Sequence, residues 1–139
     1  MLILFKKKVY LLHQILKINK LLTAVIVDDE ARNIALLSYC LEKYCPEISL
    51  VASFTKKTKA ISHLRNNKPD IFFLDIVLDV GSGFDILEAI DYEDIHVVMC
   101  SAHDEFALKA IRYQVTYYLL KPLEIQDLIS TVEKKYKRV

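Results

Sequence analysis

Two groups of acidic residues in this sequence each follow a short apolar stretch. Asp28, Asp29 and Glu30 come directly after residues 23–27, and Asp75 comes directly after residues 71–74. Such apolar stretches predict strands buried on both faces, because an exposed strand would alternate apolar with polar residues. Carboxylates that lie close together repel one another and raise each other's pKa unless a cation is present. These residue types therefore predict a site for a hard divalent cation with oxygen ligands, Mg²⁺ above all.

Two other polar residues follow apolar stretches in the same way. Ser101 comes after residues 96–100, and Lys121 comes after residues 117–120 and precedes Pro122. If all four stretches are parallel strands, these side chains reach the same sheet edge as Asp75, which is where open α/β sheets bind ligands. Lysine adds a positive charge and serine adds a hydroxyl group. An aspartate with a metal ion, a lysine and a hydroxyl around it is suited to phosphoryl chemistry.

The elements that must position these residues alternate along the chain. Apolar stretches at 23–27, 48–52, 71–74, 96–100 and 117–120 predict five strands. Apolar residues spaced by three and four predict helices at 31–45, 56–67, 83–90, 104–113 and 123–136. In the fourth helix this spacing places Phe106, Ala107, Ala110 and Ile111 on one stripe. Such an alternation builds an α/β fold, with a parallel sheet and helices on both of its faces.

Length and composition predict an ordinary globular domain. The 139 residues are 53% hydrophobic and 27% charged, with a formal net charge of +1 that favours neither nucleic acid nor membrane. The three cysteines, Cys40, Cys45 and Cys100, are an odd number without CxxC spacing. This usage suits reduced thiols, so we expect a cytoplasmic protein.

Residues 1–20 form a basic N-terminal extension. They contain five of the 19 basic residues, namely Lys6, Lys7, Lys8, Lys17 and Lys20. Residues 2–5 are too short for the apolar part of a signal peptide, and residues 9–16 are too short to span a bilayer. One interpretation is a basic amphipathic helix that contacts anionic lipid or a partner through Val9, Leu12 and Leu16. The simpler interpretation, which the sequence favours, is a poorly ordered extension without membrane contact, ahead of a domain at 21–139.

Several motifs together resemble the receiver domain of bacterial two-component response regulators, over residues 22–139. They are Val27-Asp28-Asp29-Glu30, Phe73-Leu74-Asp75-Ile76, Gly83-Phe84, Ser101-Ala102 and Tyr118-Leu119-Leu120-Lys121-Pro122. Segments 101–110 and 118–122 are similar in particular to the receivers of LytTR-type regulators. The resemblance implies a flavodoxin-like (βα)5 fold, a doubly wound parallel sheet with strand order 2-1-3-4-5.

The resemblance also implies a role for each acidic residue. Asp75 would be the phosphoacceptor, whose carboxylate takes a phosphoryl group from a phosphohistidine of a sensor histidine kinase or a phosphotransfer protein. Mg²⁺ would be bound by Asp29, Asp75 and the backbone carbonyl of Val77, while Asp28 would act mainly through a metal-bound water. Lys121 and the metal would neutralise charge on the phosphoryl group. The domain would assist its own phosphorylation and a slow dephosphorylation, and would not be an enzyme with a separate substrate.

Two residues would carry the response to phosphorylation. By the resemblance, Ser101 would bond a phosphoryl oxygen and shift inward, and Tyr118 would follow it from an exposed to a buried rotamer. These movements would change a face built from the fourth helix, fifth strand and fifth helix of the domain, through which a homodimer could form. No direct contact with nucleic acid or membrane is expected from this chain.

Other interpretations remain open from the sequence. Asp28 and Asp29 could instead cap the first helix of the domain. Asp79 stands where the family usually has proline and is expected to be a loop acid, and the Lys121-Pro122 bond could be cis or trans. The alternative function is a receiver-like interaction or dimerisation module that is never phosphorylated. A nucleotide-binding enzyme is poorly supported, because Gly81 and Gly83 are the only glycines and no GxGxxG or GxxxxGK[ST] motif occurs.

Overall fold

A five-stranded parallel sheet forms the centre of the protein. The computed structural model describes the backbone of residues 1–18 and 21–137, and the side chains of 1–11 and 21–137. The strand order is β2-β1-β3-β4-β5, so the predicted flavodoxin-like order is confirmed. The strands are β1 (Leu22–Val27), β2 (Ile48–Phe54), β3 (Ile71–Asp75), β4 (His96–Ser101) and β5 (Tyr117–Leu120). Parallel neighbours need crossover connections, and helices provide them here.

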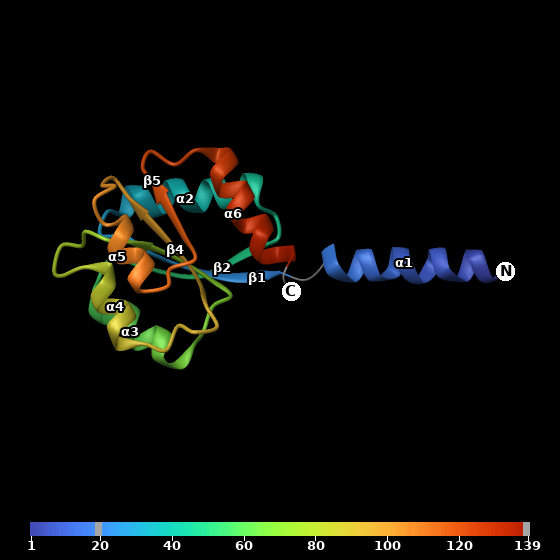
Figure 1. Ribbon diagram of the computed structural model, residues 1–139, viewed down its shortest axis with the longest axis horizontal. Coiled ribbons are helices and arrows are strands. Elements are labelled where there is room, and N and C mark those ends of the chain that lie inside the picture. Colours follow the sequence, from blue (N-terminus) through green and yellow to red (C-terminus); the bar gives the residue numbers. More distant parts are fainter. Residues whose placement is uncertain (19–20, 138–139) are drawn as a thin grey trace.

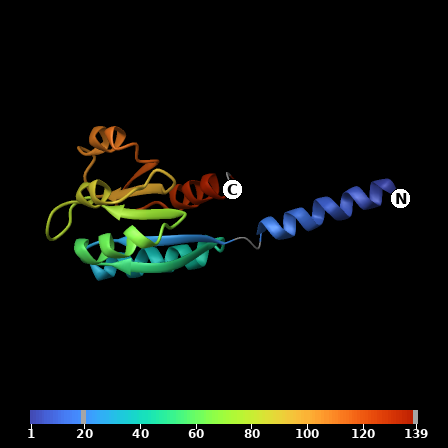
Figure 2. The ribbon, with the colours of Figure 1, turned by 90° about the horizontal axis from the view of Figure 1, so that it is seen from below.

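Helices cover both faces of this sheet, as Figures 1 and 2 show. They are α2 (Ala31–Tyr44), α3 (Lys57–Asn66), α4 (Gly83–Ala89), α5 (Ala107–Arg112) and α6 (Ile125–Lys137). The first apolar cluster joins the sheet to α3, α4 and α5 through Ala60, Leu64, Phe84, Leu87 and Ala110. The second cluster joins the opposite face to α2 and α6 through Leu37, Leu41, Leu128 and Val132. The three-layer arrangement predicted from the alternation of elements is therefore confirmed.

Strand β3 lies at the middle of the sheet and is buried along its whole length. Its side chains alternate between the two apolar clusters, with Phe72 and Leu74 in one and Ile71 and Phe73 in the other. Burial on both faces explains why this strand lacks the polar alternation of an exposed strand. Asp75 is its last residue and is consequently held by the best-packed element of the fold.

The fourth predicted helix differs from its description above. The helix is shorter than predicted, since α5 begins at Ala107 and ends at Arg112. Ala110 is buried, whereas Ile111, which the spacing placed on the same stripe, is 70% exposed. A helix of six residues has fewer than two turns and presents only one narrow face to the core. That face passes through Ala110, and the next residue turns away from it.

The N-terminal extension lies ahead of the first strand of the sheet. Residues Leu2–Ile18 form a helix, α1, which stands away from the sheet in both views (Figures 1 and 2). Residues 19 and 20 lie outside the described part of the chain. Within the part that is described, no helix combines the length and apolar character needed to cross a bilayer.

Candidate functional site

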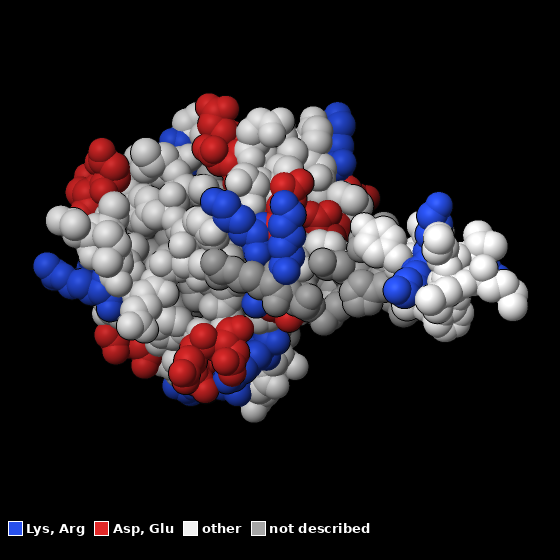
Figure 3. Space-filling model, turned by 45° about the vertical axis from the view of Figure 1, so that its right-hand side comes forward, with Lys and Arg blue, Asp and Glu red and all other residues white. Residues whose placement is uncertain are grey.

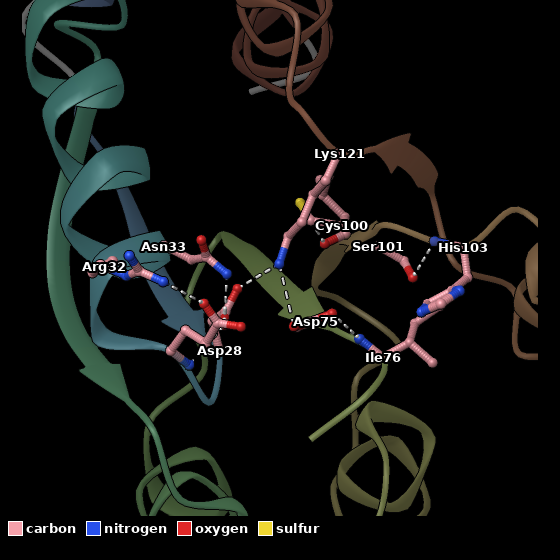
Figure 4. A network of polar contacts seen from close by, with 11 residues as sticks. Asp28, Arg32, Asn33, Asp75, Ile76, Cys100, Ser101, His103 and Lys121 are labelled. Atoms are coloured by element: carbon pink, nitrogen blue, oxygen red, sulfur yellow. Dashed lines mark hydrogen bonds and ion pairs between the residues drawn. The ribbon is translucent and has the colours of Figure 1, made fainter. Parts of the chain in front are cut away.

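The carboxyl ends of four neighbouring strands bring the predicted site residues to one edge of the sheet. Pairing of Val27 with Leu74 aligns β1 with β3, and pairing of Asp75 with Cys100 aligns β3 with β4. Because these strands are parallel and in register, the residues that follow or end them lie side by side. Figure 4 shows the outcome, with Asp28, Asp75, Ser101 and Lys121 around one space.

Three carboxylates form the acidic part of the site. Asp28, Asp29 and Asp75 each offer an oxygen atom, and these oxygens lie within 4.8 Å of one another. Asp28 and Asp75 are only 5% and 8% exposed. Glu30, predicted to reach the same edge, is instead exposed and forms an ion pair with Arg32. An all-oxygen set of carboxylates is the donor chemistry that Mg²⁺ prefers, so the residues present fit that ion.

Lys121 contacts this cluster with its ammonium group. Its Nζ donates to Asp28 Oδ2 at 2.7 Å and to Asp75 Oδ2 at 3.2 Å, as Figure 4 shows. Burial by itself lowers the pKa of Lys121, but the two carboxylates more than offset it, so the pKa is raised. The lysine therefore keeps its positive charge beside Asp75 at neutral pH. Its peptide bond to Pro122, which the sequence left open, is cis.

Burial shifts the pKa of the carboxyl groups in the opposite direction from that of Lys121. Burial raises the pKa of Asp75, and the charge of Lys121 only partly counteracts it. The pKa of Asp29 is raised too, first by burial and then by the neighbouring Asp28. Both carboxylates are therefore less stable in their charged form than in water, and a bound cation would reverse this. The backbone N–H of Ile76 donates to Asp75 Oδ1 at 2.8 Å and helps to orient it.

Asp28 contacts Lys121 and also stabilises the loop between β1 and α2. Its Oδ1 accepts hydrogen bonds from the Glu30 N–H at 2.9 Å and from the Asn33 side-chain amide at 3.3 Å. The N-cap of α2 is Glu30, and its side chain makes no capping bond, so Asp28 does not cap this helix. The sequence analysis did not select Asn33. An amide in the first turn of a helix, five residues after a site aspartate, is the only signal that could have suggested it.

The loop after Asp75 is folded tightly beneath the site. Val77 forms an isolated antiparallel bridge with Ser82, and the Gly83 N–H donates to the Ile76 carbonyl at 2.8 Å. Gly83 is required here because a Cβ atom at this position would collide with the Asp75 carbonyl oxygen. Asp79, predicted to be a loop acid, is exposed and pairs with Lys56 at 3.7 Å.

The two residues expected to respond to phosphorylation are joined through a third. Ser101 is 1% exposed and its Oγ accepts the His103 N–H at 3.1 Å. Tyr118 is half-buried and donates its hydroxyl to the His103 carbonyl. His103 thus links Ser101 to Tyr118 through its backbone, a contact that the sequence analysis did not predict. No residue-type signal could have found it, since any residue offers the same N–H and carbonyl.

An apolar groove opens beside the acidic cluster. It has a volume of about 580 Å³ and lies between α2 and α6, with Asp28, Asp75 and Lys121 at its polar end. Its apolar walls include Leu36, Leu37, Cys40, Leu123, Ile125 and Leu128. The groove therefore offers apolar contact area next to the carboxylate of Asp75.

Comparison with known proteins agrees with this geometry. The family model of the response regulator receiver domain matches residues 24–133. The LytT sensory transduction protein of Enterococcus faecalis is 34% identical over 117 residues, which are 83% of this chain and 48% of that protein. The response regulatory domain of protein mrkE from Klebsiella pneumoniae has a TM-score of 0.76 at 24% identity, over 84% of this chain and 99% of that one. A CheY-like response regulator receiver domain protein from Methanospirillum hungatei has a TM-score of 0.74 at 18% identity. The match covers 86% of this chain and 96% of that one.

The chain belongs to the response regulator receiver family of two-component systems. The predicted resemblance, including its LytT-like character, is confirmed. The chain spans about half the length of the curated LytT proteins that it matches.

Proposed function

We propose that this domain accepts a phosphoryl group on Asp75 from a phosphohistidine of a sensor histidine kinase or a phosphotransfer protein. The observation that carries the proposal is the contact of the Lys121 ammonium group with both Asp28 and Asp75 inside a cluster of three carboxylates. A merely structural ion pair needs one acid, and here three acids gather around one half-buried lysine. Such a surplus of negative charge suits a site that binds Mg²⁺ and a phosphoryl group.

The transfer forms one bond and breaks another. A carboxylate oxygen of Asp75 attacks the phosphorus atom, and the phosphorus–nitrogen bond to the donor imidazole breaks, leaving an aspartyl phosphate. Such a reaction needs little covalent help, so the main tasks are alignment and neutralisation of charge on the phosphoryl oxygens. The Ile76 N–H orients the carboxylate, and Lys121 places its positive charge beside the phosphoryl group.

The metal ligands follow from the same cluster. Asp29, Asp75 and the backbone carbonyl of Val77 would bind Mg²⁺, with Asp28 acting mainly through water. When bound, the ion supplies positive charge that offsets the repulsion between the carboxylates and the incoming phosphoryl oxygens. Before the ion binds, Asp28 positions the Lys121 side chain. The 2.7 Å contact of Lys121 Nζ with Asp28 Oδ2 is shorter than its 3.2 Å contact with Asp75 Oδ2.

The response would pass from Ser101 to Tyr118. Once Asp75 is modified, the Ser101 hydroxyl would donate to a phosphoryl oxygen and shift toward it, and this shift would act on His103, whose N–H donates to the same Oγ. Any movement of His103 changes the carbonyl that Tyr118 contacts. The outcome is a change in the face formed by α5, β5 and α6, which are the fourth helix, fifth strand and fifth helix of the domain.

The partners of this domain would be proteins. The apolar groove between α2 and α6 lies beside Asp75, so a phosphodonor that uses it brings its phosphohistidine to the carboxylate. A second copy of the domain is a further partner, through the responding face. We expect no direct contact of residues 21–139 with nucleic acid, and we expect the domain to act in the cytoplasm.

Intact mass measured after incubation with acetyl phosphate tests the proposal. We expect a gain of one phosphoryl group by the wild type in the presence of Mg²⁺, and much less without it. Asp75→Asn should gain none, because its amide is not a nucleophile. Asp79→Asn is the matched control, since Asp79 is an exposed acid of the neighbouring loop and lies outside the cluster. This control should be phosphorylated like the wild type.

Two outcomes would contradict the proposal. A gain that persists in Asp75→Asn would mean that another residue is modified. No gain by a folded wild-type protein that also fails to bind Mg²⁺ would favour an interaction module that works without phosphorylation.

A further inference from the structure

Helix α1 exposes an unusual amount of apolar surface. Seven large apolar side chains in its first eleven residues are between 52% and 72% exposed: Leu2, Ile3, Leu4, Phe5, Val9, Tyr10 and Leu11. In the core helices of the domain such side chains mostly face the sheet. Soluble domains seldom leave apolar patches of this extent in contact with water, and such patches commonly mark interaction sites.

The same helix carries only positive charge. Lys6, Lys7 and Lys8 lie in its second turn, and no acidic residue occurs in the sequence before Asp28. Figure 3 shows blue and white atoms, and no red ones, on the described part of this helix. A partner for this surface must therefore offer negative charge beside apolar groups.

Part of the apolar surface of α1 forms a stripe along the helix, while Ile3, Leu4, Tyr10 and Leu11 lie on the other side with Lys7. Leu2, Phe5 and Val9 follow one another at spacings of three and four, which places them on one stripe of a helix with 3.6 residues per turn. Leu12 and Leu16 continue this spacing in the sequence. Lys6 and Lys8 lie about 80° to either side of the stripe's centre, at 100° per residue. From such positions lysines can bury their stems and keep their ammonium groups in a polar interface.

A lipid surface fits this pattern better than a second copy of the helix. Seventeen residues make fewer than three heptads, which is short for a coiled coil. Two copies would also bring the lysine triplets of both chains together, without any acid to pair with them. Nor does the described part of α1 have the combined length and apolar character of a membrane-spanning helix.

We infer that α1 binds in the plane of membranes rich in anionic lipid, with the Leu2, Phe5 and Val9 stripe among the acyl chains and the lysines among the headgroups. The inference replaces the expectation of a disordered extension without membrane contact. It does not depend on phosphorylation, because no residue of α1 belongs to the site around Asp75. The receiver domain would be held at the lipid surface in both of its states.

Vesicle flotation of the full chain tests the inference. We expect binding to vesicles of phosphatidylglycerol and phosphatidylcholine, weaker binding at raised salt, and little binding to phosphatidylcholine alone. The triple variant K6Q/K7Q/K8Q should lose affinity roughly a hundredfold. The matched control, K59Q/K134Q/K137Q, removes the same charge from exposed positions of α3 and α6 and should bind like the wild type.

A second variant examines the apolar stripe. Phe5→Ser with Val9→Ser keeps the charge and should weaken binding at least tenfold, because less apolar area enters the membrane. The inference is overturned by no binding to anionic vesicles, by equal binding to neutral ones, or by equal losses in K6Q/K7Q/K8Q and its control. It is also overturned if sedimentation shows a dimer that the Phe5 and Val9 changes dissociate. Phosphorylation of Asp75 by acetyl phosphate in every variant shows that the domain is folded.

Discussion

At the scale of single residues, the site is a balance between burial and charge. Burial raises the pKa of Asp75, while Lys121 keeps its own proton and stabilises the charged carboxylate. The positive charge is therefore available before any phosphoryl group arrives. Preorganised charge of this kind stabilises a transition state without further reorganisation.

Val77 sets the expected lifetime of the phosphorylated state. It stands two residues after Asp75 and is 47% exposed, so solvent reaches its side chain close to the phosphoacceptor proposed above. A valine cannot hydrogen-bond the water that would hydrolyse an aspartyl phosphate. We expect Val77→Asn to hydrolyse the phosphorylated protein up to about tenfold faster, because one hydrogen bond contributes about 1 kcal/mol.

The loss of the phosphorylated species with time, followed by intact mass, measures this rate. Val80→Asn is the control, since Val80 is 71% exposed and lies further along the same loop. An unchanged rate in Val77→Asn, with normal phosphorylation, would show that this side chain does not limit hydrolysis.

At the scale of elements, the start of α4 supports the loop beneath Asp75. Ser82 caps the helix through a bond from the Phe84 N–H, and the Asp85 side chain accepts the Ser82 N–H at 2.9 Å. Lys57 of α3 donates to the same carboxylate of Asp85 at 3.2 Å. This capping box therefore ties α3, α4 and the Val77–Ser82 bridge together.

The capping box should make stability depend on pH. The bond from the Ser82 N–H and then that from Lys57 lower the pKa of Asp85 below its ordinary value of 3.8. A lowered pKa in the folded state means that the stabilisation is fully present above pH 3.8 and is lost as the pH falls through the folded value. We expect Asp85→Asn to lower the melting temperature at pH 7, with the difference from wild type disappearing in strong acid.

Thermal unfolding followed by circular dichroism at several pH values measures this difference. Asp79→Asn, which changes an exposed acid whose ion pair with Lys56 is 3.7 Å long, serves as the control and should have little effect. If the difference in melting temperature between Asp85→Asn and wild type stays constant from pH 7 into strong acid, the charge of the Asp85 carboxylate is not its cause.

At the scale of the whole molecule, the face formed by α5, β5 and α6 exposes large apolar side chains. Leu108 and Ile111 of α5 and Leu120 of β5 are 72%, 70% and 51% exposed. Because β5 is an edge strand, this part of the surface is not covered by another strand of the sheet. Exposed apolar groups near Tyr118, which we propose to respond to phosphorylation, are suited to a contact that forms after this modification.

We expect phosphorylation to favour a dimer through these side chains. Ile111→Arg should weaken that dimer at least tenfold without reducing phosphorylation of Asp75, because it places a charge in an apolar contact. Sedimentation velocity with and without acetyl phosphate measures the dimer. Val51→Arg on the opposite edge strand is the control. Equal dimerisation of Ile111→Arg and wild type would exclude this face as the interface.

Much of the fold and the site could be predicted from the sequence, for a local physical reason. Buried strands such as residues 71–74 need apolar side chains on both faces, and aspartates placed directly after such strands are conspicuous. The types and positions of Asp28, Asp75 and Lys121 therefore indicated both the sheet edge and its chemistry. The strand order, which the structure confirms, and the roles proposed for each residue came from the resemblance to a family.

Other features were decided only by the tertiary structure. The link from Ser101 to Tyr118 runs through the backbone of His103, and backbone groups carry no residue-type signal. The exposure of Ile111 depends on where α5 begins and which face meets the sheet. The Asn33 contact to Asp28 depends on the direction in which α2 leaves β1. Each depends on how segments pack against one another, and residue spacing within one segment does not contain that information.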